Sequence, residues 1–142
     1  MNWLPKKNVV VPIDFSEQSM QAVSLALQMT EETSDIHIIH VLPPLMVAEP
    51  GVVWDEIDDQ SRIKHAKEAI TDELSGEQFQ GVNLVVKIGD PGHAVADLAR
   101  DVCAELIVMP SHGRTGLAHI LIGSVTERVV RMAHCPVLVL RD

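Results

Sequence analysis

The stretch of this sequence best suited to chemistry runs from residue 110 to 127 and reads PSHGRTGLAHILIGSVTE. Gly113 and Gly123 enclose nine residues, and Gly123 with Ser124 leads directly into a helical pattern. Glycine lets a backbone approach a ligand closely, and the free N–H groups at a helix start attract anions. The spacing therefore predicts an anion cradle. The polar side chains expected to contact the anion are Ser111, His112, Arg114 and Ser124.

The same residues also fit an interpretation that needs no ligand. Ser124 and Glu127 have the spacing of a capping box, in which a serine and a glutamate satisfy the first N–H groups of a helix. The segment is not a Walker A loop, because no Gly-Lys-Ser/Thr follows a four-residue spacer, and it is not GxGxxG. At this point anion binding and simple capping both stay open.

Asp14 is the second candidate, because it directly follows an apolar run that ends at Ile13. A carboxylate there could accept ribose hydroxyls, bind a metal, or serve as a turn residue before a helix. A phosphoacceptor role, as in response-regulator receiver domains, needs an acidic cluster around Mg²⁺. Asp14 stands alone in its segment, so this role is not expected.

Other catalytic chemistry has little support. The seven histidines show no metal-ligand spacing, so no metal site is predicted. Ser111 has Met109 two residues before it, where a nucleophile elbow requires glycine. No Ser/His/acid set is arranged in a recognisable way, and we therefore assign no catalytic residue.

The charge pattern singles out the same stretch. The 142 residues carry 20 acidic and 11 basic side chains, a net charge of −9, yet no acidic residue lies between Leu106 and Thr126. Binding to nucleic acid requires cations at each phosphate contact, and aromatic residues at 3% are too few for a base-stacking platform. An acidic chain with one neutral stretch excludes polyanions but admits a small anion.

Five short apolar runs rich in β-branched residues alternate with helical patterns, as in parallel sheets buried on both faces. The predicted strands cover residues 8–13, 35–42, 82–88, 105–109 and 136–140, and the predicted helices cover 16–32, 62–74, 91–103 and 124–133. Right-handed crossovers then give an α/β fold, a three-layer, doubly wound parallel sheet with helices on both faces. We predict five strands in the order 3-2-1-4-5. We expect residues 1–142 to form a single domain.

Such sheets bind ligands beyond the carboxyl ends of the strands, at the point where strand order reverses. Here that point lies between the first and fourth strands, where segments 12–16 and 109–113 would meet. The second segment opens the acid-free stretch, so the predicted location and the charge pattern agree. Long connections at 43–55 and 110–123 are also expected to be functional.

The chain resembles the universal stress protein family, a group of small flavodoxin-like domains. The resemblance lies in VVVPIDFS at 9–16, IIHV at 38–41, and IVMPSHGRTGLAHILIGSVTERVVRMAHCPVLVLR at 107–141. Many members bind ATP through the pattern G-x2-G-9x-G-(S/T). Gly113, Gly123 and Ser124 match this pattern, whereas Pro110 takes the place of its first glycine.

For the nucleotide-binding branch, the resemblance implies a role for each part of the site. Gly113 and the stretch 123–125 would hold the phosphates, Asp14 would approach the ribose, and Val41 with the first strand's end would line the adenine pocket. Pro110 offers no N–H, so one backbone contact is lost. The residues expected to bind nucleotide are Pro12, Ile13, Asp14, Val41, Met109, Ser111, His112, Gly113, Arg114, Gly123, Ser124 and Val125.

The resemblance predicts an adenine-nucleotide-binding stress-response protein that acts as a regulatory homodimer, with little or no ATP turnover. The expected ligand is ATP, ADP or AMP, which Mg²⁺ could accompany. The alternative is an interaction module of the same fold that binds no nucleotide. One observation separates them, namely whether the purified protein retains or binds nucleotide.

The last apolar run, from Pro136 to Leu140, is an expected edge strand, and exposed apolar edges recruit a partner strand. In the resembled family this strand commonly pairs with its own copy, so we predict a two-fold homodimer, together with an unidentified protein partner. The sequence has no apolar signal region near its start and no run of about 18 apolar residues, so we expect a cytoplasmic protein without membrane contact.

Overall fold

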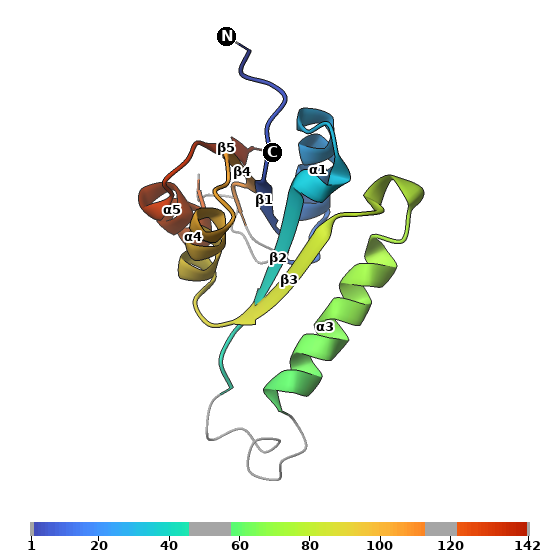
Figure 1. Ribbon diagram of the computed structural model, residues 1–142. Coiled ribbons are helices and arrows are strands. Elements are labelled where there is room, and N and C mark those ends of the chain that lie inside the picture. Colours follow the sequence, from blue (N-terminus) through green and yellow to red (C-terminus); the bar gives the residue numbers. More distant parts are fainter. Residues whose placement is uncertain (1, 46–57, 113–121, 142) are drawn as a thin grey trace.

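A computed structural model describes residues 2–45, 58–112 and 122–141 of the chain (Figure 1). The strands are β1 (Val9–Pro12), β2 (Ile36–Leu42), β3 (Asn83–Ile88), β4 (Leu106–Pro110) and β5 (Val137–Leu140). The helices are α1 (Glu17–Met29), α3 (Asp59–Glu73), α4 (Pro91–Asp101) and α5 (Ser124–Met132), with single 3-10 turns at Thr33–Asp35 and Glu77–Phe79.

All five strands are parallel and lie in the order β3-β2-β1-β4-β5, which confirms the predicted fold. The central strands are the most apolar, since every residue of β4 is buried and Val9, Val10 and Val11 of β1 are fully inaccessible. A strand covered on both faces needs apolar side chains at consecutive positions. This requirement made the strands easy to recognise.

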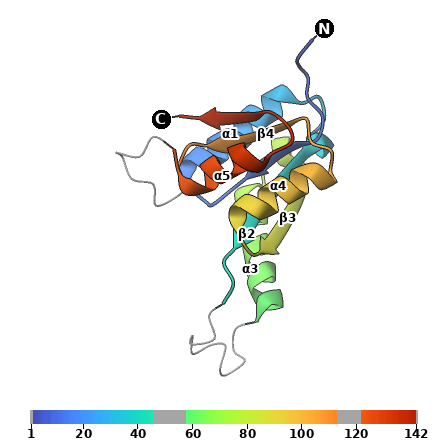
Figure 2. The ribbon, with the colours of Figure 1, turned by 90° about the vertical axis from the view of Figure 1, so that its left-hand side faces the viewer.

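The helices form a layer on each face of the sheet. One apolar cluster joins the sheet to α1 and α3 and includes Val23, Ile38 and Ile70. The other joins it to α4 and α5 and includes Val95 and Val129. Figure 2 shows α4 and α5 next to each other in front of the sheet. The molecule is therefore the three-layer sandwich that the alternating pattern predicts.

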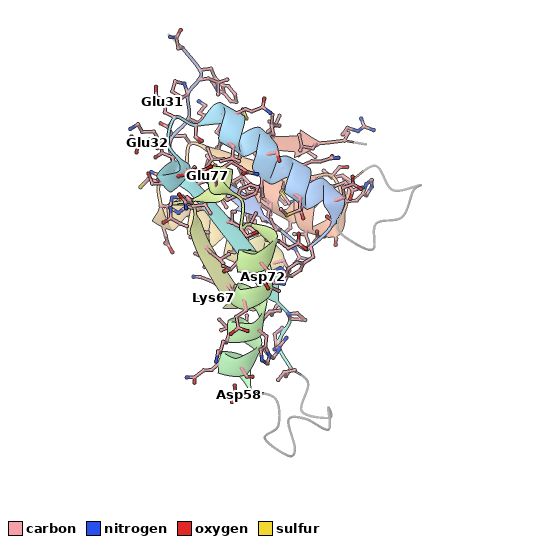
Figure 3. All side chains as sticks on the ribbon, turned by 90° about the vertical axis from the view of Figure 1, so that its right-hand side faces the viewer. Glu31, Glu32, Asp58, Lys67, Asp72 and Glu77 are labelled. Carbon is pink, nitrogen blue, oxygen red and sulfur yellow. The ribbon has the colours of Figure 1, made fainter. Side chains whose placement is uncertain are left out.

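The excess negative charge is prominent on the α1 and α3 side. Figure 3 shows the acidic side chains of Glu31, Glu32, Asp72 and Glu77 there, and all four residues are exposed. The face that carries α4 and α5 is therefore the better place for an anionic ligand.

Among the helices that the structure describes, none combines the length and the apolar composition that crossing a bilayer requires.

Candidate functional site

A pocket opens where β1 and β4 separate. The ladder between β1 and β2 runs to Pro12 and Ile39, but the ladder between β1 and β4 ends at Val10 and Ile107. Beyond that pair the two strands part toward the carboxyl edge of the sheet. The pocket that forms there has a volume of about 150 Å³. It lies at the reversal of strand order, where the sequence places the binding site.

The pocket brings together many of the predicted site residues. Those on its wall are Pro12, Ile13, Asp14, Val41, Met109, His112 and Val125. Ser111, Gly123 and Ser124 do not line the pocket. Ser111 lies between two lining residues, Pro110 and His112, and the other two directly precede the lining residue Val125. Gly113 and Arg114 lie outside the described residues. So do most of the long connection at 43–55 and most of the one at 110–123.

Sequence reasoning missed several residues of the pocket wall. They are Ser19, Ile39, His40, Pro91, Val95 and Thr126, while Pro110, which stands at the first glycine of the family pattern, also lines the pocket. Pro91 and Val95 belong to α4, which the sequence predicts as a helix at 91–103 without any site residue on it. A doubly wound sheet places helix starts at the same edge as the strand ends. That rule could have assigned the first turn of α4 to the site.

Two hydrogen bonds fasten the start of α5 to the end of β4. The Gly123 N–H donates to the Ser111 carbonyl oxygen at 2.6 Å, and the buried Thr126 hydroxyl donates to the Pro110 carbonyl oxygen at 2.9 Å. The Ser111 N–H in turn donates to the Leu140 carbonyl oxygen of β5 at 2.8 Å. The first turn of α5 is therefore held at a fixed place beside the pocket.

The capping box predicted for α5 does not form. The residue that precedes the helix is Gly123 rather than Ser124, and no side chain within the described residues caps the helix start. The Glu127 carboxylate accepts a hydrogen bond from the Arg131 guanidinium at 2.6 Å instead. A capping box is impossible in this register, because Ser124 is already the first helical residue.

The other described helices begin differently. Ser16 caps α1, Asp58 caps α3 and Asp90 caps α4, each through a side-chain oxygen that accepts a backbone N–H of the first turn. Such caps satisfy donors that the helix itself leaves free. At α5 no side chain of the described residues caps the first turn, and Val125 of that turn lines the pocket.

Asp14 combines a turn role with a place on the pocket wall. Its carboxylate Oδ1 accepts a hydrogen bond from the Ser16 N–H at 3.0 Å, and its own N–H donates to the Ser19 hydroxyl at 3.4 Å. The turn interpretation of Asp14 is therefore correct. It does not compete with a ligand role, because a carboxylate oxygen accepts more than one hydrogen bond.

Ser111 and His112 continue β4 toward the pocket. Ser111 is buried, and its hydroxyl lies 3.3 Å from Nδ1 of His112. His112 lines the pocket, whereas Ser111 does not. The serine thus contacts the histidine rather than the pocket interior.

The start of α4 is tied to α5 by charge. Asp90 accepts hydrogen bonds from the His93 backbone N–H at 3.0 Å and from the His93 ring at 2.7 Å, and it pairs with the Arg128 guanidinium. The bonds from His93, followed by Arg128, hold the pKa of Asp90 well below its ordinary value. Gly92 packs under the Arg128 side chain, since a Cβ there would lie 2.6 Å from Arg128 Cδ.

The fold and site define a doubly wound α/β protein with a small pocket at the switch point of its sheet and, beside it, a helix start that follows Gly123. The chain belongs to the universal stress protein family, whose model matches residues 6–141. This match covers all of the described helices and strands.

Among its relatives, universal stress protein MJ0531 of Methanocaldococcus jannaschii is 33% identical over 95% of this chain and 82% of its own length. The protein MJ0577 of the same organism is 29% identical over 95% of this chain and 94% of its own. The solved structure of MJ0577 superposes with a TM-score of 0.78 and covers 98% of both chains. A universal stress protein solved in complex with cAMP is 25% identical, with a TM-score of 0.63 over 96% of this chain and 98% of its own.

Proposed function

We propose that this chain is an adenine-nucleotide-binding regulatory protein that acts as a homodimer and turns over little or no ATP. The observation that carries the proposal is the helix start at Gly123, which no side chain of residues 2–45, 58–112 or 122–141 caps and which lies beside an apolar pocket. Backbone N–H groups at a helix start and the helix dipole favour a phosphate. An apolar pocket next to them favours a base.

The pocket and the helix start would divide the nucleotide between them. Pockets that bury a whole drug-sized ligand measure about 300–1,000 Å³, and this one is about 150 Å³. It would therefore take the base, against the apolar side chains of Val41, Val95 and Met109. The phosphates would lie across the rim at Ser124 and Val125.

Asp14 would bind the ribose. Asp14 lines the pocket, and each oxygen of a carboxylate can accept more than one hydrogen bond. Met109 and Pro12 lie on the two strand ends that flank this position. Gly113 and Arg114, which the family pattern places near the phosphates, belong to the proposal on sequence alone. If Mg²⁺ accompanies the nucleotide, the phosphates would supply its ligands, since a cluster of three metal-binding side chains is absent from the described residues.

Low turnover is supported by the chemistry of α5. Hydrolysis requires a base that orients water at the transferred phosphate. Glu127 is the one acidic residue of the first turn, and its carboxylate is bonded to Arg131. It is therefore poorly placed to activate water.

The solved cAMP complex of a 25% identical relative supports a purine nucleotide as ligand of this fold.

The dimer would form through β5. This strand is the last in the sheet order, and each of its four residues is partly exposed. A parallel edge strand offers unpaired N–H and C=O groups to a second copy. Val130, which is 48% exposed on the outer face of α5, would extend the apolar contact.

The first experiment is mass spectrometry of nucleotide retained by the purified native protein, followed by calorimetric titration with ATP, AMP and cAMP. We expect one nucleotide per chain and a measurable heat at micromolar concentration. Absence of retained nucleotide together with absence of heat at millimolar ATP would refute nucleotide binding and favour the interaction module. Light scattering at micromolar protein concentration tests the dimer separately. A monomeric mass would refute the proposed homodimer.

A further inference from the structure

His40 of β2 holds the backbone that carries Asp14. Its Nδ1 lies 2.8 Å from the Ile13 carbonyl oxygen. A carbonyl can only accept, so Nδ1 carries the hydrogen and donates it. The Ile13 N–H donates to the Ile39 carbonyl oxygen at 2.9 Å. The peptide groups on both sides of Ile13 are therefore fastened to β2.

The residue that follows Asp14 contacts the same histidine. Phe15 has a φ of 66°, in the left-handed region that a bulky side chain rarely adopts. Its ring packs edge-on against the His40 imidazole, with centroids 4.9 Å apart and an angle of 72° between the planes. A strained backbone persists only where its surroundings hold it. His40 supplies part of that support.

These contacts come from the face of the sheet that α1 and α3 cover. Side chains alternate along β2, so Ile38 and Leu42 belong to the cluster with α1 and α3, while Ile39 and Val41 face α4 and α5. His40 shares the face of Ile38, where Phe15 also packs. Val95 and Val125, which line the pocket beyond the strand ends, belong to the opposite face, whereas Ser19 of α1 and His40 line it from the α1 and α3 face.

We propose that His40 is a positioning residue of the nucleotide site, which acts through the Ile13 carbonyl to place the Asp14 carboxylate at the pocket. This inference rests on the proposed function, because it takes Asp14 as the group that binds the ribose. The imidazole holds the turn through the Ile13 carbonyl, and the ligand would contact the turn at Asp14.

The test compares two substitutions that treat the Nδ1 donor differently. His40→Asn keeps an N–H donor close to the position of Nδ1, whereas His40→Leu removes it. We expect AMP affinity, measured by calorimetry, to fall about tenfold in His40→Leu and to stay within about threefold of the parent in His40→Asn. Equal losses in both variants would overturn the proposal.

His37 provides the matched control. It lies on the same strand and its Nε2 is 3.1 Å from the Asn8 side-chain oxygen, at the end of the sheet away from the pocket. His37→Asn replaces the His37 ring as His40→Asn replaces the His40 ring. It should leave AMP affinity within about twofold of the parent. A loss as large as that of His40→Leu would assign the effect to general damage to β2.

A double-mutant cycle separates positioning from a structural role. If His40 acts through Asp14, then His40→Leu should weaken AMP binding no further once Asp14→Ala is present. Additive losses would show that His40 acts by another route and would overturn the proposal.

A measurement without ligand distinguishes this proposal from the function on which it rests. At neutral pH the imidazole ¹⁵N spectrum should show the His40 hydrogen on Nδ1, and exchange of the Ser16 amide, which is bonded to Asp14, should accelerate about tenfold in His40→Leu but not in His40→Asn. If the parent binds no nucleotide, the proposed function fails and these two readouts still decide whether His40 positions Asp14. A hydrogen on Nε2 alone, or unchanged exchange in His40→Leu, would refute it.

Discussion

Helices α4 and α5 begin side by side at the pocket, yet their first turns are satisfied in opposite ways. Pro91 of α4 and Val125 of α5 both line the pocket. At α4 the Asp90 carboxylate accepts the His93 N–H at 3.0 Å, and at α5 the preceding residue is Gly123, which has no side chain. The chain thus supplies its own carboxylate to the start of α4, whereas among the described residues no side chain caps the start of α5.

The comparison also explains which helix start can bind a ligand. Asp90 is engaged by His93 and by Arg128, and these bonds keep its pKa low, so the carboxylate stays charged at neutral pH. A second anion at α4 would meet that charge. The carboxylate in the first turn of α5, that of Glu127, is in an ion pair with Arg131. Phosphate binding is therefore favoured at one of the two adjacent helices.

Giving α5 the same cap as α4 should have the largest effect. In Gly123→Asp the new carboxylate would accept the first N–H groups and repel phosphate, so ATP affinity should fall about 100-fold or more while the melting temperature stays equal or rises. Calorimetry and thermal unfolding measure the two effects. Gly123 has φ −74° and ψ 162°, which any residue adopts, so the variant should fold.

Two further variants at this position separate charge from size. Gly123→Val should also weaken ATP binding, by blocking close approach of the phosphate, and Gly123→Ala should weaken it least. Unchanged affinity in both Gly123→Asp and Gly123→Val would show that the phosphates do not lie at this helix start.

Detaching α5 from β4 should reduce stability. Thr126→Val keeps the shape of the side chain but removes the hydroxyl that donates to the Pro110 carbonyl oxygen, so we expect a loss of about 1.5 kcal/mol in the free energy of unfolding. Urea denaturation measures this. Thr71→Val is the control, because the exposed Thr71 hydroxyl makes a comparable bond to Lys67 on α3. If the free energy of unfolding falls equally in both variants, burial of the Thr126 hydrogen bond adds nothing to stability.

Removing the cap of α4 should lower the melting temperature without affecting the ligand. Asp90→Ala loses a cap and two ionic contacts, so we expect a decrease of about 3 °C and ATP affinity within about twofold of the parent. Asp58→Ala removes a cap of α3 that lacks the contact to a second helix, and it should lower the melting temperature less. A marked loss of ATP affinity in Asp90→Ala would break the contrast between α4 and α5.

The smallest effect should appear in the pH dependence. The pKa of Asp90 is lowered on folding from an ordinary value of 3.8, so the folded state binds fewer protons than the unfolded state in acid. Its contribution to stability is present above that value and is lost as the pH falls below it. The difference in urea midpoint between the parent and Asp90→Asn should therefore shrink from pH 5 to pH 3.

The fold was predictable because its signals are local and strong. Buried parallel strands require consecutive apolar residues, and the handedness of crossovers then restricts the strand order. Helix ends were less predictable. Helix α3 begins at Asp59, three residues before the predicted start, because Asp58 caps it ahead of its apolar face.

The site was predictable on its strand side and incomplete on its helix side. Strand ends such as Pro12 and Met109 follow from topology, but the wall formed by Val95 depends on how closely α4 packs against α5. The capping box at Ser124 failed for a related reason. Local spacing does not reveal that Thr126 is bonded to Pro110, which fixes the helix in its observed register.

The separation of β1 from β4 also bears on how the protein folds. The two residue pairs that join these strands, beginning with Val9 and Leu106, connect segments nearly a hundred residues apart in the chain. Closing such a long loop is entropically unfavourable, so we expect this seam to form late in folding. A molecule bound in the gap above the seam contacts both halves and can bind only after they have met. Its occupancy would then slow unfolding at the junction where the sheet last closes.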